Sequence, residues 1–215
     1  MERKGKYNKA LRSKNYFDFD TYITKERWSS FYNQIYEIVA LEPDSLLEIG
    51  PGNNYLKNIL LSEGIKYKSC DVDPDVDPDF VSDIRCLSDV IKVKFDVVVA
   101  FQVLEHLPYK YFKSNLQQLS KRSSKYVIIS VPVNGISYDF KMALSKKIKI
   151  RFYGKLPLMR TSLSKEHFWE IRNPVPLKKI ISDIKEEFKI LKHYQCEDNV
   201  YHYFFVLEKI RVDER

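Results

Sequence analysis

Short apolar runs alternate along the chain with stretches of helical periodicity. The run at residues 45–49 meets a Gly-Pro-Gly turn, after which helical spacing continues to Gly64. Apolar strands that alternate with helices are typical of a parallel sheet covered on both faces. Further predicted strands lie at 67–72, 80–84, 95–101 and 126–131, with a helix at 109–121.

A helix precedes this alternating region and a strand pair follows it. Residues 22–40 have amphipathic helical spacing that stops before Pro43, and 174–187 predict another helix. The strands predicted at 188–196 and 200–209 are joined by a short turn-prone segment and form a hairpin. We therefore expect an α/β fold, a Rossmann-like three-layer sandwich whose mostly parallel seven-stranded sheet carries an antiparallel C-terminal hairpin strand.

Two segments depart from this rhythm. Residues 1–20 carry charges and aromatic residues without a clean period, and we interpret them as a basic N-terminal arm. Residues 134–165 are basic, aromatic and too long for an ordinary connection, which indicates an inserted lid or acceptor-recognition segment. The 215 residues, 44% of them hydrophobic, suffice for one domain core, so we expect a single domain over 21–215.

Composition limits the classes of protein that fit. The sequence has neither a transmembrane stretch nor the apolar core of a signal peptide, so we expect a cytoplasmic protein. Three widely spaced cysteines offer neither a disulfide framework nor a CxxC metal site, and we expect buried, reduced thiols. The formal charge of +7 suits nucleic acid, anionic lipid or an anionic small substrate and does not choose among them.

The Gly-Pro-Gly turn is the first candidate ligand site. A glycine-rich turn at the carboxyl end of a strand lets the backbone approach a ligand, and the following helix presents free N–H groups. Gly50 and Gly52 suit such a turn. The spacing departs from the dinucleotide fingerprint G-x-G-x-x-G, with Asn54 in place of a small residue, which weakens an NAD-binding interpretation.

Carboxylates near the Gly-Pro-Gly turn strengthen its interpretation as a ligand site. Asp71 ends the second predicted strand, where it can accept hydrogen bonds from both ribose hydroxyls of an adenosine; Asp73 is a nearby competitor. We interpret the aspartates at 75, 77 and 79 as a solvated acidic turn. The spacing and closing glutamate of a calcium-binding EF-hand loop are missing, so we expect no metal site.

Five segments in order resemble the class I S-adenosylmethionine-dependent methyltransferases, particularly the type 11 group. They are LLEIGPGNN, CDVDP, SDI, FDVVVAFQVLEHLP and YVIISVPV, within residues 46–133. The resemblance implies S-adenosylmethionine as cofactor. It assigns the methionine end to Glu48, Gly50, Gly52, Phe101 and Gln102, the ribose to Asp71, and the adenine to Val72, Asp83 and Ile84; Asn54 could donate to the cofactor.

Methyl transfer from a sulfonium is an in-line displacement that needs an aligned acceptor and, at most, a group to remove its proton. His106, after the fourth major strand, is the first candidate base, with a packing role as its alternative; we assign Glu105 to structure. His167 is the second catalytic candidate. Phe168 and Trp169 are expected in the core, and His193 and His202 are expected to be structural.

The acceptor stays open at this stage. No N-P-P-Y-type motif follows the fourth strand and no Pro-Cys nucleophile is present, which disfavours DNA amines and pyrimidine C5. We expect a small-molecule, lipid or glycan acceptor. RNA is an alternative because of the basic arm and insertion, and a non-catalytic scaffold is another. An NAD-dependent dehydrogenase is disfavoured by the EIGPGNN spacing, and the oligomeric state is undetermined.

Overall fold

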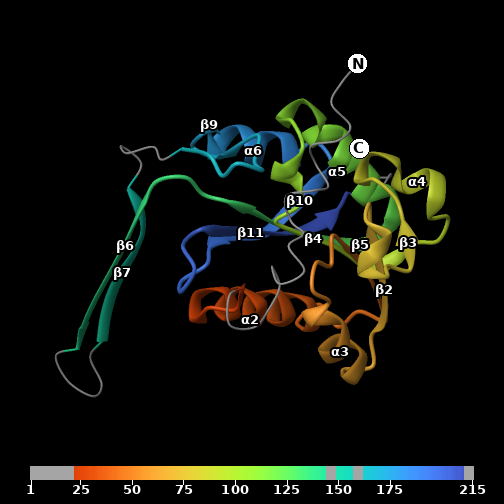
Figure 1. Ribbon diagram of the computed structural model, residues 1–215, viewed down its shortest axis with the longest axis horizontal. Helices are drawn as coiled ribbons and strands as arrows, with labels where there is room; N and C mark the ends of the chain where they lie inside the picture. The colour runs from red at the N-terminus through yellow and green to blue at the C-terminus, as the bar shows by residue number, and fades with distance from the viewer. Residues whose placement is uncertain (1–21, 144–148, 157–161, 211–215) are drawn as a thin grey trace.

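A seven-stranded sheet lies at the centre of the computed structural model, which describes residues 22–143, 149–156 and 162–210 (Figure 1). The predicted N-terminal arm and parts of the predicted insertion lie outside these ranges. The sheet strands are β1 (Ser45–Ile49), β2 (Lys66–Asp71), β3 (Phe80–Val81), β4 (Phe95–Phe101), β5 (Ser123–Pro132), β10 (Phe188–Gln195) and β11 (His202–Lys209). The helices that cover it are α2 (Lys25–Val39), α3 (Tyr55–Ser62), α4 (Leu87–Val90), α5 (Phe112–Arg122) and α6 (Leu177–Ile184).

The strand order is β10-β11-β5-β4-β1-β2-β3. The pairs β3–β2, β2–β1, β1–β4 and β4–β5 are parallel, whereas β11 is antiparallel to both β5 and β10. In the C-terminal hairpin, β11 and not β10 pairs with β5. The antiparallel strand β11 therefore lies second from the edge of the sheet. The predicted α/β fold with a mostly parallel seven-stranded sheet is confirmed.

Helices cover both faces of the sheet, as side-chain alternation along the strands requires. In β4, Val98 and Ala100 belong to the core beneath α4, α5 and α6, while Val97 and Val99 belong to the core beneath α2 and α3. These four side chains are completely buried. Such two-sided burial explains why β4 is a continuous apolar run rather than an alternating one.

Several element boundaries differ from those predicted. Residues 174–175 form the short strand β9 (Pro174–Val175), which pairs with β8 (Glu170–Ile171), so the helix predicted from 174 begins only at Leu177. Pro176 explains the delay, because a proline disfavours helical geometry in the residue before it. The strand predicted at 80–84 stops at Val81, since Asp83 caps a 3₁₀ turn over Ile84–Cys86.

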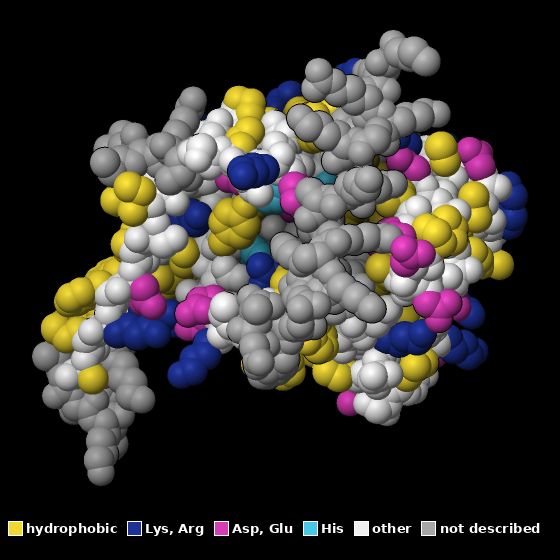
Figure 2. Space-filling model, viewed as in Figure 1, with side chains coloured by type: hydrophobic (Ala, Val, Ile, Leu, Met, Phe, Trp, Pro, Cys, Tyr) yellow, Lys and Arg dark blue, Asp and Glu magenta, His cyan; other side chains and the backbone are white. Residues whose placement is uncertain are grey.

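Part of the predicted insertion is an antiparallel hairpin that projects from the sheet domain, β6 (Ile136–Ala143) with β7 (Lys149–Leu156) (Figure 1). Its register places apolar residues opposite one another, for example Phe140 opposite Phe152. Both rings are more than half exposed, and hydrophobic side chains gather along this arm in Figure 2. The outer face is thus apolar and uncovered in the described structure. The other members of this face are Ile136, Tyr138, Met142, Ile150 and Leu156.

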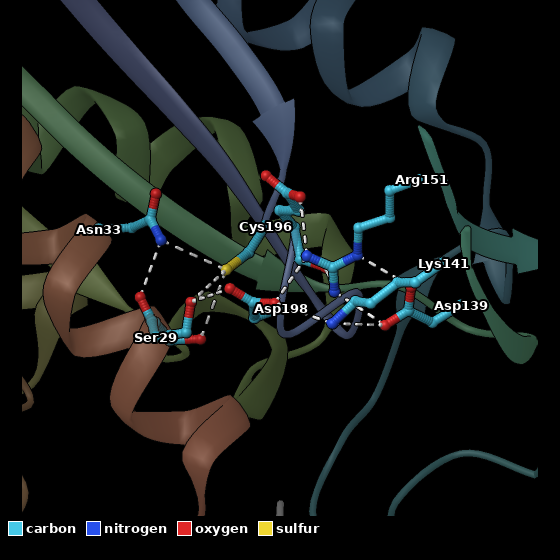
Figure 3. A network of polar contacts seen from close by, with 9 residues as sticks. Ser29, Asn33, Asp139, Lys141, Arg151, Cys196 and Asp198 are labelled. Carbon is cyan, nitrogen blue, oxygen red and sulfur yellow. Dashed lines mark hydrogen bonds and ion pairs between the residues drawn. The ribbon is translucent and has the colours of Figure 1, made fainter. Parts of the chain in front are cut away.

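Ion pairs hold the polar face of the hairpin against the sheet domain (Figure 3). Arg151 contacts Asp139 across the hairpin and Glu197 and Asp198 in the turn between β10 and β11, with N–O distances of 2.7–2.8 Å. Lys141 pairs with Asp139 at 3.4 Å. Individual exposed pairs contribute about 0–1 kcal/mol, but a shared network with a largely covered arginine fixes the direction of the arm.

The three cysteines are free, as expected from their spacing. Cys70 and Cys196 are buried, and the Asn33 amide on α2 donates to the Cys196 sulfur at 3.5 Å (Figure 3). Cys86 is exposed, so the expectation of burial is wrong for this residue. Among the described residues, no helix combines the length and apolar character needed to cross a bilayer.

The neighbouring aromatic residues Phe168 and Trp169 have different environments. Trp169 is 1% exposed, packs edge-on against Tyr109 and Phe112, and donates from Nε1 to the Leu107 carbonyl at 3.0 Å. The side chain of Phe168 is 43% exposed. The prediction of a core position is therefore confirmed for Trp169 and wrong for Phe168.

We predict that Trp169→Ala lowers the free energy of unfolding by about 3–5 kcal/mol, because it leaves a cavity and removes a buried hydrogen bond. Phe168→Ala is the matched control and should cost less than about 1 kcal/mol. Urea unfolding followed by circular dichroism measures both changes. Equal losses in the two variants would contradict the assigned packing.

Candidate active site

The candidate site lies where the order of the parallel strands reverses, since β1 lies between β2 on one side and β4 on the other. Ligands of open α/β sheets bind at this switch point, beyond the carboxyl ends of the strands. The loop after β1 is bound both to β2 and to the turn after it: the Gly50 N–H donates to the Cys70 carbonyl in β2 at 2.9 Å, and the Asn54 amide donates to the Val76 carbonyl at 3.3 Å. The loops after β1 and β2 thus form one rim.

The loop after β1 requires left-handed backbone at three positions. Gly50, Gly52 and Asn54 have φ values of 69°, 57° and 59°. A Cβ on Gly50 would lie 2.7 Å from a methyl group of Val103, so only glycine fits beside the loop after β4. Asn54 tolerates this conformation better than most residues do.

Unsatisfied polar atoms mark the same loop. Asn53 Nδ2 and Asn54 Oδ1 are buried without a hydrogen-bond partner among the described residues. Buried amide atoms are rarely left unpaired unless a ligand or water satisfies them. The loop therefore fits a polar ligand such as the methionyl end of S-adenosylmethionine, which the sequence assigned to it.

Glu48 is a buried carboxylate beneath this loop. Its side chain is 4% exposed and accepts a 2.6 Å hydrogen bond from the Tyr67 hydroxyl. Burial raises the pKa of Glu48 to about 7, although the Tyr67 hydrogen bond opposes that shift. A cationic ligand group would favour its ionised form.

Asp71 ends β2 and faces the same rim. Its carboxylate accepts from the Asp73 N–H at 2.9 Å, which fixes its direction, and the next residue, Val72, is 44% exposed. Asp73, the competing candidate, caps the turn at 74–76 by accepting from the Asp75 N–H. Asp79 is more than a solvated turn residue, because it accepts from the Ser69 N–H and pairs with Lys68.

Two of the residues predicted to contact the adenine have other partners in the structure. The Asp83 carboxylate pairs with the Arg85 guanidinium through two hydrogen bonds of 2.9 and 2.7 Å. The Ile84 side chain is 4% exposed and belongs to the core. The exposed Val72 therefore offers more apolar surface to an adenine ring than Ile84 does.

The loop after β4 brings in the last predicted cofactor contacts. Phe101 is 9% exposed and packs against Phe204. Gln102 has a left-handed φ of 57°. With its amide oxygen turned toward Ser130 Oγ, its nitrogen donates to Glu105 Oε1 at 3.3 Å. Gln102 thus connects the end of β4 to Glu105.

His106 and His167, sixty-one residues apart, lie together at this edge of the sheet, with ring centroids 5.0 Å apart. Two hydrogen bonds bind their segments: Phe168 N–H to the Glu105 carbonyl at 2.9 Å, and His106 Nδ1 to the Glu166 carbonyl at 3.2 Å. The bond from the Trp169 indole to Leu107 adds a third. The two sequence-predicted catalytic candidates therefore share one site.

Three acidic or basic groups of this site have shifted pKa values. Burial and the neighbouring His167 lower the pKa of His106 to about 4, so it is neutral at physiological pH. Burial raises the pKa of Glu105 to about 8. Burial also acts to raise the pKa of Glu170, but hydrogen bonds from His167, Asn134 and Tyr201 lower it to about 2.

The sequence predicted no individual role for Glu170, Tyr201 or Asn134. His167 Nδ1 lies 3.0 Å from Glu170 Oε1, which also accepts from the Tyr201 hydroxyl at 3.0 Å, while Asn134 donates to Oε2 at 2.8 Å. The local spacing of His167 and Glu170 was the only available signal. Asn134 and Tyr201 reach the site from distant segments, which no local pattern indicates.

Comparison with known proteins defines the class. The sequence model of a methyltransferase domain family matches residues 21–169, more than half of the chain. The protein belongs to this family, and the methyltransferase class predicted from the sequence is confirmed. No curated protein matches the chain with significant similarity.

Solved structures share the fold at low sequence identity. An S-adenosylmethionine-dependent methyltransferase from Clostridium acetobutylicum aligns with a TM-score of 0.58 and 13% identity, covering 89% of this chain and 94% of that one. The N-methyltransferase NodS from Bradyrhizobium japonicum, in complex with S-adenosyl-L-homocysteine, aligns with a TM-score of 0.59 and 11% identity. The alignment covers 94% of this chain and 95% of that one. Magnesium protoporphyrin IX methyltransferase from Synechocystis, with bound SAH, aligns with a TM-score of 0.58 and 14% identity. The alignment covers 86% of this chain and 84% of that one.

The contact between Gly50 and Val103 makes a prediction about the loop. Gly50→Ala should lower the free energy of unfolding by about 1–3 kcal/mol through backbone strain and overlap with Val103. In a Val103→Ala background the overlap is absent but the strain remains, so Gly50→Ala should cost less stability there than in the unaltered protein. Thermal unfolding of the two single variants and the double variant measures both costs. An equal cost of Gly50→Ala in the two backgrounds would contradict the close contact.

Proposed function

We propose that this protein transfers the methyl group of S-adenosylmethionine to an oxygen or nitrogen of a small-molecule, lipid or glycan acceptor. The observation that carries the proposal is the convergence, at one edge of the sheet, of a glycine loop, two carboxylates and a pair of histidines. The cofactor supplies an activated methyl group on a sulfonium. The chain then has to bind it, exclude water and align the acceptor.

The cofactor residues of the proposal are those named from the sequence, with Asn53 added and the buried Ile84 left out. Gly50 and Gly52 let the backbone pass beneath the methionyl portion, and the unsatisfied amide atoms of Asn53 and Asn54 suit its polar end. Glu48 meets the ammonium group, directly or through water. Asp71 binds the ribose; Val72 and Asp83 border the adenine; Phe101 and Gln102 close the methionine side.

The acceptor in this proposal binds between the end of β4 and the base of the β6–β7 hairpin. Lys155 lies there with its ammonium group 4.7 Å from the centre of the Tyr201 ring, and Arg172 donates to the Lys155 carbonyl at 2.8 Å. His106 and His167 are the groups that meet the reacting atom. The hairpin then acts as the acceptor-recognition segment, through the face that carries Lys155 and is directed toward the domain.

RNA is the weaker alternative. The described basic residues of the hairpin include Arg151 and Lys141, and both are paired with carboxylates. Paired cations attract phosphates less than a continuous basic stripe does. Among the similar solved structures, the glycopeptide N-methyltransferase MtfA and the magnesium protoporphyrin IX methyltransferase have acceptors other than nucleic acid.

Calorimetric titration tests cofactor binding. We expect S-adenosylmethionine to bind saturably and Asp71→Ala to weaken binding about 10–100-fold, because charged hydrogen bonds contribute about 1.5–3 kcal/mol. NAD should not bind. Asp75→Ala, which removes an exposed carboxylate from the same turn, is the matched control and should bind normally. Absence of S-adenosylmethionine binding to the unaltered protein would overturn the proposal and favour a scaffold.

The raised pKa of Glu48 makes cofactor binding pH-dependent. An ammonium group favours the ionised carboxylate, so below the pKa of about 7 binding must first release a proton. Affinity should therefore fall as the pH drops below 7, by up to about tenfold per unit. Titrations at several pH values measure this slope.

The Glu48→Gln variant should bind S-adenosylmethionine more weakly and lose the pH dependence of the affinity. Glu37 is a different buried carboxylate, on α2 and away from the loop, so Glu37→Gln should keep the pH dependence. A wild-type affinity that is flat through neutral pH would exclude contact between Glu48 and the cofactor ammonium group.

A further inference from the structure

We propose that Glu105, His106 and His167 bind one divalent transition-metal cation, Zn²⁺ being the best match, beside the end of β4. Each of the three side chains offers one ligand atom, and these atoms lie within 4.8 Å of one another. The sequence predicted no metal site, because the ligands come from segments sixty residues apart. Within the described residues, this is the group of His, Cys, Asp and Glu side chains that converges closely enough to hold an ion.

Both imidazole rings have hydrogen-bond partners of the kind that metal-binding histidines have. His167 Nδ1 faces the Glu170 carboxylate at 3.0 Å, and His106 Nδ1 faces the Glu166 carbonyl at 3.2 Å. Both partners are acceptors, so we assign a proton to Nδ1 of each ring, and metal binding then uses the lone pair of Nε2. Histidines that bind metals typically donate their other N–H to a carboxylate or a carbonyl in this way.

Glu105 supplies the second, independent observation. Its side chain is fully buried, and Oε2 has no hydrogen-bond partner in the described structure, while Oε1 is within reach of the Gln102 amide. Burying a carboxylate oxygen costs free energy unless the oxygen is paired or coordinates a metal. A metal ion held between this carboxylate and the two imidazoles would supply the missing partner.

The ligand set narrows the choice of ion. Two imidazole nitrogens and one carboxylate are typical of Zn²⁺ and related first-row metals, whereas Mg²⁺ prefers oxygen ligands. Three protein ligands also leave an open position, as in catalytic zinc sites. With metal–ligand bonds of about 2.1 Å, tetrahedral donors lie roughly 3.4 Å apart, so side-chain rotation must draw the three atoms together by up to about 1.4 Å.

The role of the ion rests on the proposed methyl transfer, whereas its binding does not. An acceptor hydroxyl at the open position would release its proton to solvent more readily beside a Lewis acid. Its oxygen would then form a bond to the methyl carbon as the carbon–sulfur bond breaks and the sulfur keeps the electron pair. His106 and His167 would thus act as ligands rather than as a general base.

Metal binding is tested on the full-length chain carrying no histidine tag, stripped with chelator and titrated separately with Zn²⁺, Co²⁺ and Mg²⁺. We expect one Zn²⁺ per chain, Co²⁺ binding with the visible absorption of a low-symmetry site, and no comparable Mg²⁺ binding. His106→Ala, His167→Asn and Glu105→Gln should each weaken Zn²⁺ binding at least about 100-fold. Glu170→Gln, which alters the partner of His167 but none of the three ligands, should weaken it about 10–100-fold.

His193→Ala is the matched control, because His193 contacts Tyr203 on β11 outside the cluster and should bind Zn²⁺ normally. Circular dichroism identifies any unfolded variant, and His167→Asn, at a partly exposed position, remains informative if Glu105→Gln does not fold. Stoichiometric Zn²⁺ binding that survives His167→Asn, or no binding by the unaltered protein, would overturn the inference. Separate titration with S-adenosylmethionine distinguishes failure of this site from failure of the proposed function.

Discussion

The close approach of the loops after β1 and β4 is the constraint on which the site depends. Gly50 leaves no room for a side chain beside Val103, and its left-handed backbone turns the chain into α3. The same contact positions the segment after β4, where Gln102 also takes a left-handed conformation and the 3₁₀ turn Leu104–His106 begins. The glycine loop and the segment that leads to His106 are therefore in direct contact at the switch point of the sheet.

Three buried glutamates at this edge show how partners, rather than burial, set the charge of a group. Glu48 has one hydroxyl donor and Glu105 has an unpartnered oxygen, and burial raises the pKa of both. Glu170 is nearly as buried but accepts from a histidine, an amide and a hydroxyl, which lower its pKa to about 2. The site thus combines two carboxyl groups that burial makes harder to ionise with one carboxylate that already orients an imidazole.

The β6–β7 hairpin is an addition that leaves the sheet domain intact. Its strands pair with each other and not with the seven-stranded sheet, so its length does not disturb the strand order. Alternation places Lys155, Tyr153 and Arg151 on the face toward the domain, and Arg151 fixes that face through the β10–β11 turn. The apolar face is consequently directed outward, away from the sheet domain.

The sequence by itself determined the sheet, most of its helices and the glycine loop, because strand and helix periods, proline stops and glycine turns are local properties of the chain. It also named His106 and His167 separately. Only the tertiary structure decided that these two rings meet, that Glu170 and Tyr201 orient His167, and that Glu105 is buried beside them. Likewise, it separated buried Trp169 from exposed Phe168. Such relations depend on packing between segments distant in the sequence, and no spacing along the chain encodes them.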